Sequence, residues 1–237
     1  MTAAVPPPGL DRARAVIRRG TVLSTIALLG IAGVYVLAAA FTPIEARQGV
    51  AQKIFYLHVP AAWSALLAFS LVGIVSVLYL WLEDPRLDRF AASSAEVGVV
   101  FAAVMLTTGP IWAKPIWGTW WTWDARLTLT LFLFFLFVGY LSLRGALNDR
   151  RERARFSAVV GIMGLVLVPF VHLSVYLFRT LHPQPIVLKP SAPSLPWEML
   201  RTLLVSTLMF TLLYVGLVTL RYGIGLAAEA REVHDAG

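Results

Sequence analysis

The chain has 237 residues, of which 58% are hydrophobic and 14% charged. A soluble domain carries about 25% charged residues, so this composition favours a protein solvated by lipid over a soluble fold. Cysteine is absent, which excludes disulfides, thiol chemistry and cysteine metal sites in this chain, and the formal net charge of +7 comes mostly from arginines in short runs beside apolar segments. Such runs are typical of membrane topology signals, so nucleic acid is not expected as a partner.

Six apolar stretches follow one another along the chain, each close to the roughly 20 residues that a transmembrane helix needs. They lie at about Thr21–Phe41, Val59–Trp81, Ala92–Ile111, Leu127–Leu143, Phe156–Phe178 and Thr202–Leu220. The first stretch lacks a small-residue cleavage site followed by a polar mature domain, so we expect a membrane anchor rather than a signal peptide. The sequence therefore predicts an all-α integral membrane protein with six transmembrane helices, forming a single membrane domain over residues 1–237.

The basic residues predict the orientation of these helices. With the N-terminus inside, thirteen of the twenty lysines and arginines fall on the inner side and seven on the outer side. The strongest signal is the loop RGALNDRRERAR at 144–155. By the positive-inside rule both termini are expected in the cytoplasm. Three outer loops then cover about 42–58, 112–126 and 179–201.

The second outer loop, WAKPIWGTWWTWDAR, is the most informative stretch. It holds five of the eight tryptophans, namely Trp112, Trp117, Trp120, Trp121 and Trp123. An aromatic belt at the membrane interface is one interpretation, because tryptophan favours that interface. A helical loop would align Trp117 with Trp121 and Asp124, and an extended loop would align Trp117 with Trp121 and Trp123. Either arrangement predicts a flat apolar platform, which suits a large planar ligand.

Other residues refine the expectation for this loop. Pro115 and Gly118 disfavour a long helix, so we expect a short interfacial helix or a turn. Asp124 and Arg126 are too costly for the hydrocarbon centre and are expected at the interface, where a mutual ion pair is their simplest role. Glu96, a few residues inside the third stretch, is expected to meet interfacial water or a partner on another helix.

Two of the four histidines, His58 and His182, fall in the first and third outer loops, on the side of the tryptophans. A single histidine at a membrane edge is usually a packing residue, and this is the role expected of His172 in the fifth stretch. Two imidazoles beside a planar apolar surface instead form a candidate heme site, because histidine is a common axial ligand of heme iron. Five outer cations are candidate partners for the heme propionates, and the sequence does not rank them. They are Arg47, Lys53, Lys114, Arg126 and Arg179.

The segment WGTWWTWDARLT at 117–128 closely resembles the tryptophan-rich WWD signature of the heme-handling proteins of cytochrome c maturation. YLHVPAA at 56–62 and TLH at 180–182 resemble the two outer-loop histidine motifs of one branch, the heme exporter protein C (CcmC) family. The resemblance covers nearly the whole chain. It implies a multi-pass protein of the bacterial inner membrane that binds heme b transiently at the periplasmic face and passes it to the heme chaperone CcmE.

The same resemblance implies further partners and site residues. The partners are the ABC-type complex of CcmA and CcmB and the small membrane protein CcmD. His58 and His182 are implied as axial ligands of the iron. The implied heme and chaperone contact surface, with Arg126 beside it, consists of Trp117, Gly118, Trp120, Trp121, Trp123 and Asp124.

Two other functions share some of these sequence features. A cytochrome c heme lyase or synthase of the CcmF or CcsA type shares the tryptophan loop, but is usually larger and has further histidines within the membrane. Here only His172 lies inside a predicted span. A heme permease would need a polar site at the membrane midplane or a pair of broken helices, and neither is evident. The sequence therefore favours a heme-delivering membrane protein that is not itself an enzyme.

Overall fold

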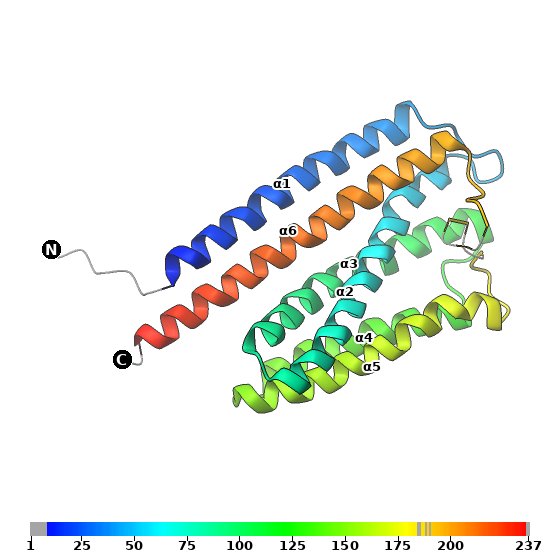
Figure 1. The fold of residues 1–237 in the computed structure, drawn as a ribbon. Helices are drawn as coiled ribbons and strands as arrows, with labels where there is room; N and C mark the ends of the chain where they lie inside the picture. The colour runs from blue at the N-terminus through cyan, green and yellow to red at the C-terminus, as the bar shows by residue number, and fades with distance from the viewer. Residues whose placement is uncertain (1–8, 184–185, 188, 190, 236–237) are drawn as a thin grey trace.

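The computed structural model describes residues 9–183, 186–187, 189 and 191–235, and six long α-helices run through that part of the chain (Figure 1). They are α1 (Leu10–Ala40), α2 (Phe55–Leu82), α3 (Pro85–Trp117), α4 (Ala125–Ala146), α5 (Arg150–Leu177) and α6 (Trp197–Asp235), with a short 3-10 helix, η1 (Val50–Ile54), before α2. The described residues contain no strand, only an isolated bridge between Glu45 and Gly49. All six α-helices are long and apolar enough to cross a membrane, which confirms the predicted fold class.

The helices are longer than the predicted spans. Each span falls on one helix, with only its last residue outside in the first and fifth, and most helices continue beyond the span into polar sequence. The 39 residues of α6 reach about 58 Å at 1.5 Å per residue, whereas the hydrocarbon layer is only about 30 Å thick. Hydropathy marks the part of a helix that needs lipid, and the polar turns beyond it are stabilised by contacts with other helices.

Aspartates begin three of the helices. The Asp84, Asp124 and Asp149 carboxylates accept hydrogen bonds from backbone N–H groups in the first turns of α3, α4 and α5, at 2.8, 3.0 and 2.8 Å. These bonds satisfy N–H groups that have no partner within the helix. The same residues therefore define where the chain re-enters a helix after each of these turns.

The two ends of the bundle differ in what they carry. Gly9 and Asp235, the first and last described residues, lie at one end, which we call the termini end (Figure 1). The segment Trp117–Asp124 lies at the opposite end, which we call the tryptophan end. The beginning of α2, the end of α3 and the beginning of α4 meet at the tryptophan end, and the chain from α5 to α6 crosses it.

Helix α1 packs along α6, while α2 contacts α3, α5 and α6. The α1–α6 contact depends on small residues. A Cβ at Gly216 would lie 2.7 Å from the Ser24 backbone nitrogen, and one at Gly20 would be 2.8 Å from the Gly216 carbonyl oxygen. In the other half of the bundle, Phe69 of α2 stacks on Phe137 of α4 with ring centroids 3.9 Å apart. Close backbone approach and aromatic stacking thus set the rotation of the helices, which decides which side chains meet at either end.

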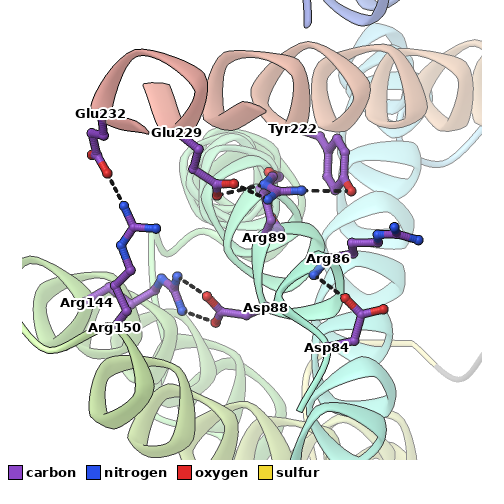
Figure 2. Close-up of polar contacts among 10 residues, drawn as sticks. Asp84, Arg86, Asp88, Arg89, Arg144, Arg150, Tyr222, Glu229 and Glu232 are labelled. Carbon is purple, nitrogen blue, oxygen red and sulfur yellow. Dashed lines mark hydrogen bonds and ion pairs between the residues drawn. The ribbon is translucent and has the colours of Figure 1, made fainter. Parts of the chain in front are cut away.

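Charged side chains tie the helices together near the termini end (Figure 2). Arg144 of α4 donates two hydrogen bonds to Asp88 of α3, and both side chains are mostly buried, at 15% and 18% exposure. Arg89 pairs with Glu229 of α6 and donates to the Tyr222 hydroxyl at 3.1 Å. Further pairs in this half of the bundle are Arg150–Glu232, Arg151–Glu83 and Arg221–Glu96. The last pair confirms the helix partner expected for Glu96.

Candidate functional site

The tryptophan loop is shorter than predicted. The expected loop was 112–126, but α3 continues through Trp112 and Pro115 to Trp117, and α4 begins at Ala125. The extra turns persist because Trp112 is held from outside α3, since its indole N–H donates to Gln48 Oε1 at 3.1 Å and its ring meets the edge of Phe55. The helix ends at Gly118, whose φ of 75° is a left-handed conformation that glycine adopts readily. Pro115 therefore does not stop the helix as expected, and Gly118 does.

The short loop that remains is neither helical nor a flat extended strand. Its residues 118–124 contain no helix or strand, and the rings of Trp121 and Trp123 meet edge to face at 77° with centroids 5.8 Å apart. The prediction of a flat platform is therefore wrong, and the indoles form an angled corner instead. A shallow, open hollow of about 290 Å³ lies beside this corner, lined by Leu106, Trp121, Trp123 and Leu131. Its walls come from α3, α4 and the loop, so it offers an apolar hollow next to the indoles.

The tryptophans differ in their exposure. Trp120 is 56% exposed and Trp123 is 76% exposed, whereas Trp117 and Trp121 are half-buried. The indole nitrogen of Trp121 is buried and has no hydrogen-bond partner among the described residues. An unpaired buried N–H costs free energy, so this group is available to a ligand.

Asp124 joins two loops rather than pairing with Arg126. Its carboxylate caps α4, and it also accepts from the Thr122 hydroxyl at 3.2 Å and from the Leu181 backbone N–H at 3.4 Å. No Asp124–Arg126 salt bridge occurs in the part of the chain that the structure describes, so the predicted ion pair is not formed. The contact with Leu181 instead places the residue before His182 against the tryptophan loop.

His58 lies in the first turn of α2 and faces α3. Its Nδ1 is 3.0 Å from Thr108 Oγ1, and its ring meets the edge of the Trp112 ring with centroids 5.8 Å apart. His182 lies in the connection between α5 and α6, where its Nδ1 donates to the Pro183 carbonyl oxygen at 3.0 Å. In both rings Nδ1 is engaged, which leaves Nε2 for another partner.

Electrostatics connect the two histidines with Arg126. His58 and His182 are close enough to interact electrostatically, and the Arg126 guanidinium acts on both. Burial lowers the pKa of His182 to about 4, and the positive charge of Arg126 adds to this shift. His182 is therefore a neutral imidazole at pH 7, which is the form that binds a metal.

The structure distinguishes the five outer cations that the sequence could not rank. Lys53 donates to the carbonyl oxygens of Thr42 and Pro43, and Lys114 donates to the Gly118 carbonyl oxygen at 2.9 Å. Arg126 is half-buried in the first turn of α4, and its Nη1 has no partner among the described residues. The remaining two, Arg47 and Arg179, are exposed. Arg126 is thus the cation whose charge acts on both histidines and whose Nη1 is an unused donor among the described residues.

His172 lies apart from the other two histidines, and three residues around His58 were not expected from the sequence. His172 of α5 lies beside Tyr176 with ring centroids 6.4 Å apart, and no described contact joins it to His58 or His182. Thr108, Trp112 and Gln48, which hold His58 directly or through one another, were not identified from sequence. Thr108 carries no signal in an apolar stretch, whereas Trp112 was noted only as a member of the tryptophan cluster.

Two imidazoles, a half-buried guanidinium and a corner of indoles thus lie at one end of a six-helix bundle, and the six apolar helices define a multi-pass membrane protein. The profile described as "CcmC: Heme exporter protein C" matches residues 8–235, and the chain belongs to this family. Membership implies a role in heme handling for cytochrome c maturation.

Individual relatives agree with this assignment. The chain is 37% identical to the heme exporter protein C of Haemophilus influenzae over 205 residues, which cover 86% of this chain and 82% of the relative. It is also 37% identical to the protein of that name from Bradyrhizobium diazoefficiens, over 82% of this chain and 73% of the relative. A putative cytochrome c biosynthesis ccmC-like mitochondrial protein of Marchantia polymorpha is 39% identical over 59% of both chains. The similarity therefore extends to a protein described as mitochondrial.

Proposed function

We propose that this protein binds heme b at the tryptophan end and delivers it to the periplasmic heme chaperone CcmE. The observation that carries the proposal is the convergence of His58 and His182, each with Nδ1 engaged and Nε2 available, next to the unpartnered guanidinium nitrogen of Arg126. Porphyrin supplies four ligands to its iron, so two axial imidazoles complete the coordination. The donor set therefore fits heme, whereas a bare zinc ion would need more protein ligands.

Each part of the site has a distinct role in this proposal. His58, from the first turn of α2, and His182, from the α5–α6 connection, would hold the iron, and the indole of Trp121 would pack against the porphyrin, with Gly118 and Asp124 shaping the loop around it. Arg126 pairs with a propionate, because a guanidinium forms strong charge-assisted hydrogen bonds with carboxylates. Trp117 closes α3 beneath the loop, while the exposed rings of Trp120 and Trp123 offer a surface for the chaperone.

Release is expected to begin at His182. Among the described residues, His182 is held by its own loop and by the Leu181–Asp124 contact, whereas His58 is held by side chains of α3. A docked chaperone that displaces the α5–α6 connection would remove one axial ligand and leave the other in place. We further propose that CcmA, CcmB and CcmD associate with this protein, with the bundle as their membrane contact.

The visible absorption spectrum tests the iron ligands. The protein purified together with CcmE is compared with its His58→Ala and His182→Ala variants, and His234→Ala at the termini end serves as the matched control. We expect the heme Soret band to collapse or shift in both site variants and to remain unchanged in the control. A band that survives both site variants would contradict ligation by these histidines, and a wild-type protein without heme would leave the tryptophan loop as a docking surface only.

We also propose that the bundle lies in the bacterial inner membrane with the tryptophan end facing the periplasm, because the basic residues concentrate toward the termini end. Alkaline phosphatase fused after Lys189 is expected to be active, since this enzyme needs the periplasm, and the same reporter after Asp149 is expected to be inactive. The reverse pattern would overturn the orientation and, with it, the periplasmic site.

A further inference from the structure

The ring of His58 is enclosed by three consecutive features of α3. Thr108 Oγ1 lies 3.0 Å from Nδ1, and the Trp112 ring meets the imidazole edge to face. Between them is Gly109, where an added Cβ would lie 3.2 Å from His58 Cε1, tighter than an ordinary van der Waals contact. Within the sequence Thr-Gly-Pro-Ile-Trp at 108–112, the threonine therefore bonds to the imidazole, the glycine leaves room for it, and the tryptophan packs against it.

The hydrogen bonds of Thr108 indicate which nitrogen of His58 carries the proton, and the Met105 backbone carbonyl is a second hydrogen-bond partner of the ring. A threonine hydroxyl has one proton to donate and two lone pairs that accept. Thr108 Oγ1 lies 2.7 Å from the Val104 carbonyl oxygen, which can only accept, so the hydroxyl proton belongs to that bond. If the proton pointed to His58 instead, two oxygen lone pairs would face each other at this distance. His58 Nδ1–H is therefore the donor to Thr108, and Nε2 carries the free lone pair.

The position of the ring is fixed as well as its proton. Trp112 is anchored by the hydrogen bond from its indole N–H to Gln48 and by the edge contact with Phe55, so the wall beside His58 has little freedom. Gly109 lets the imidazole approach α3 closely enough for the Thr108 bond. His182 has a simpler arrangement, because its Nδ1 donates to the carbonyl of the next residue, which also leaves Nε2 free.

We propose that Thr108 is a positioning residue for heme iron, which holds His58 as the Nδ1–H tautomer with Nε2 directed at the metal, while Gly109 and Trp112 fix the plane of the ring. This inference rests on the proposed heme-binding function. Hydrogen-bonded partners of metal-ligating histidines orient the ring and raise the basicity of the ligand, and their loss typically lowers metal affinity about 10–100-fold. Thr108 does not touch the iron and acts only through His58.

The test is a titration of heme into the purified apoprotein, with the electron paramagnetic resonance spectrum and the reduction potential of the loaded protein as further readouts. Thr108→Val keeps the shape of the side chain and removes the hydroxyl. We expect about 10–100-fold weaker heme binding and a changed low-spin signal. Thr108→Ser keeps the hydroxyl and is expected to restore both. Thr107→Val is the matched control, because its hydroxyl bonds only to the Ala103 carbonyl on an exposed face.

The outcomes separate this inference from the function on which it rests. If His58→Ala binds heme like the wild type, the proposed function fails. If His58→Ala loses heme but Thr108→Val matches Thr107→Val in affinity, spectrum and potential, Thr108 has no positioning role. A second measurement needs no variant at position 108: nitrogen-15 NMR of histidine-labelled apoprotein, with the His58 signal assigned through His58→Ala, should show a protonated Nδ1. A protonated Nε2 would overturn the inference even if Thr108→Val fails to fold.

Discussion

The termini end and the tryptophan end of this bundle differ in the polar side chains that they hold and in how many of these form ion pairs between helices. Near the termini end, Arg144 and Arg89 each have a carboxylate partner on another helix (Figure 2), and Arg221 pairs with Glu96 of α3. At the tryptophan end, the nitrogen atoms Trp121 Nε1 and Arg126 Nη1 are buried without partners among the described residues. Paired charges stabilise contacts between helices, whereas an unpaired buried donor costs stability. Arg153 Nε, near the termini end, is buried without a partner among the described residues as well, so the ion pairs between helices distinguish that end, and the histidines and indoles distinguish the other.

The largest effect is expected from breaking the buried pair at the termini end. Arg144→Ala leaves Asp88 buried without its two hydrogen bonds, and removing one partner of a buried pair costs about 3–5 kcal/mol. The measurement is the free energy of unfolding in mixed detergent micelles. Arg150→Ala is the control, because the Arg150–Glu232 pair is more than 60% exposed on both sides and exposed pairs contribute about 0–1 kcal/mol. Equal effects of the two variants would remove the distinction between buried and exposed pairs.

Replacing Arg126 is expected to change stability less than replacing Arg144, and to lower heme affinity rather than the free energy of unfolding. Arg126→Met removes an unpaired buried donor, so the unfolding free energy of the apoprotein should stay constant or rise by about 1 kcal/mol. Heme affinity should fall about tenfold, because a charge-assisted hydrogen bond to a propionate is lost. Lys114→Met is the matched control, since its Nζ already donates to the Gly118 carbonyl oxygen. Heme affinity that is unchanged in Arg126→Met, or lowered equally in both variants, would show that Arg126 is not the propionate partner.

The smallest effect is expected from replacing tryptophans, and it should differ between the half-buried Trp121 and the exposed Trp120. Trp121→Ala should weaken heme binding by about 0.5–1.5 kcal/mol, the typical contribution of an aromatic contact beyond its buried area. Trp120→Ala should leave heme affinity nearly unchanged and weaken retention of CcmE instead, because the Trp120 ring is 56% exposed. Heme titration and co-purification with tagged CcmE measure the two effects, with membrane insertion checked for both variants. If neither heme binding nor CcmE retention changes, the tryptophans are better interpreted as an aromatic belt at the membrane interface.

Much of the fold followed from local properties of the sequence. The number of helices and their positions were predicted correctly, because the cost of placing a residue in hydrocarbon is summed over about 20 neighbours and needs no knowledge of the rest of the chain. The helix ends were predicted less well. The polar turns of α6 around Glu229 are held by Arg89 of α3, 140 residues away in the sequence, and Trp112 keeps α3 helical through Gln48.

The candidate site divides in the same way. His58, His182 and the tryptophans were identified from residue type and motif, and the comparisons assign the chain to the family that those motifs resemble. The geometry around them was not predictable, since the angled Trp121–Trp123 corner, the Asp124–Leu181 contact and the Thr108–His58 hydrogen bond each depend on how separate elements meet.

By itself, then, the sequence determined that six helices cross a membrane and that imidazoles and indoles are available in the segments between them. Only the tertiary structure decided that Thr108 faces His58 and that the Arg126 charge acts on both histidines while its Nη1 has no partner among the described residues. The physical reason is the distance along the sequence over which each property is determined. Transfer into lipid depends on each residue and its neighbours along the chain, whereas side-chain pairing depends on the rotation and register of whole helices. Those are set by distant contacts such as Gly20 against Gly216 and Phe69 against Phe137.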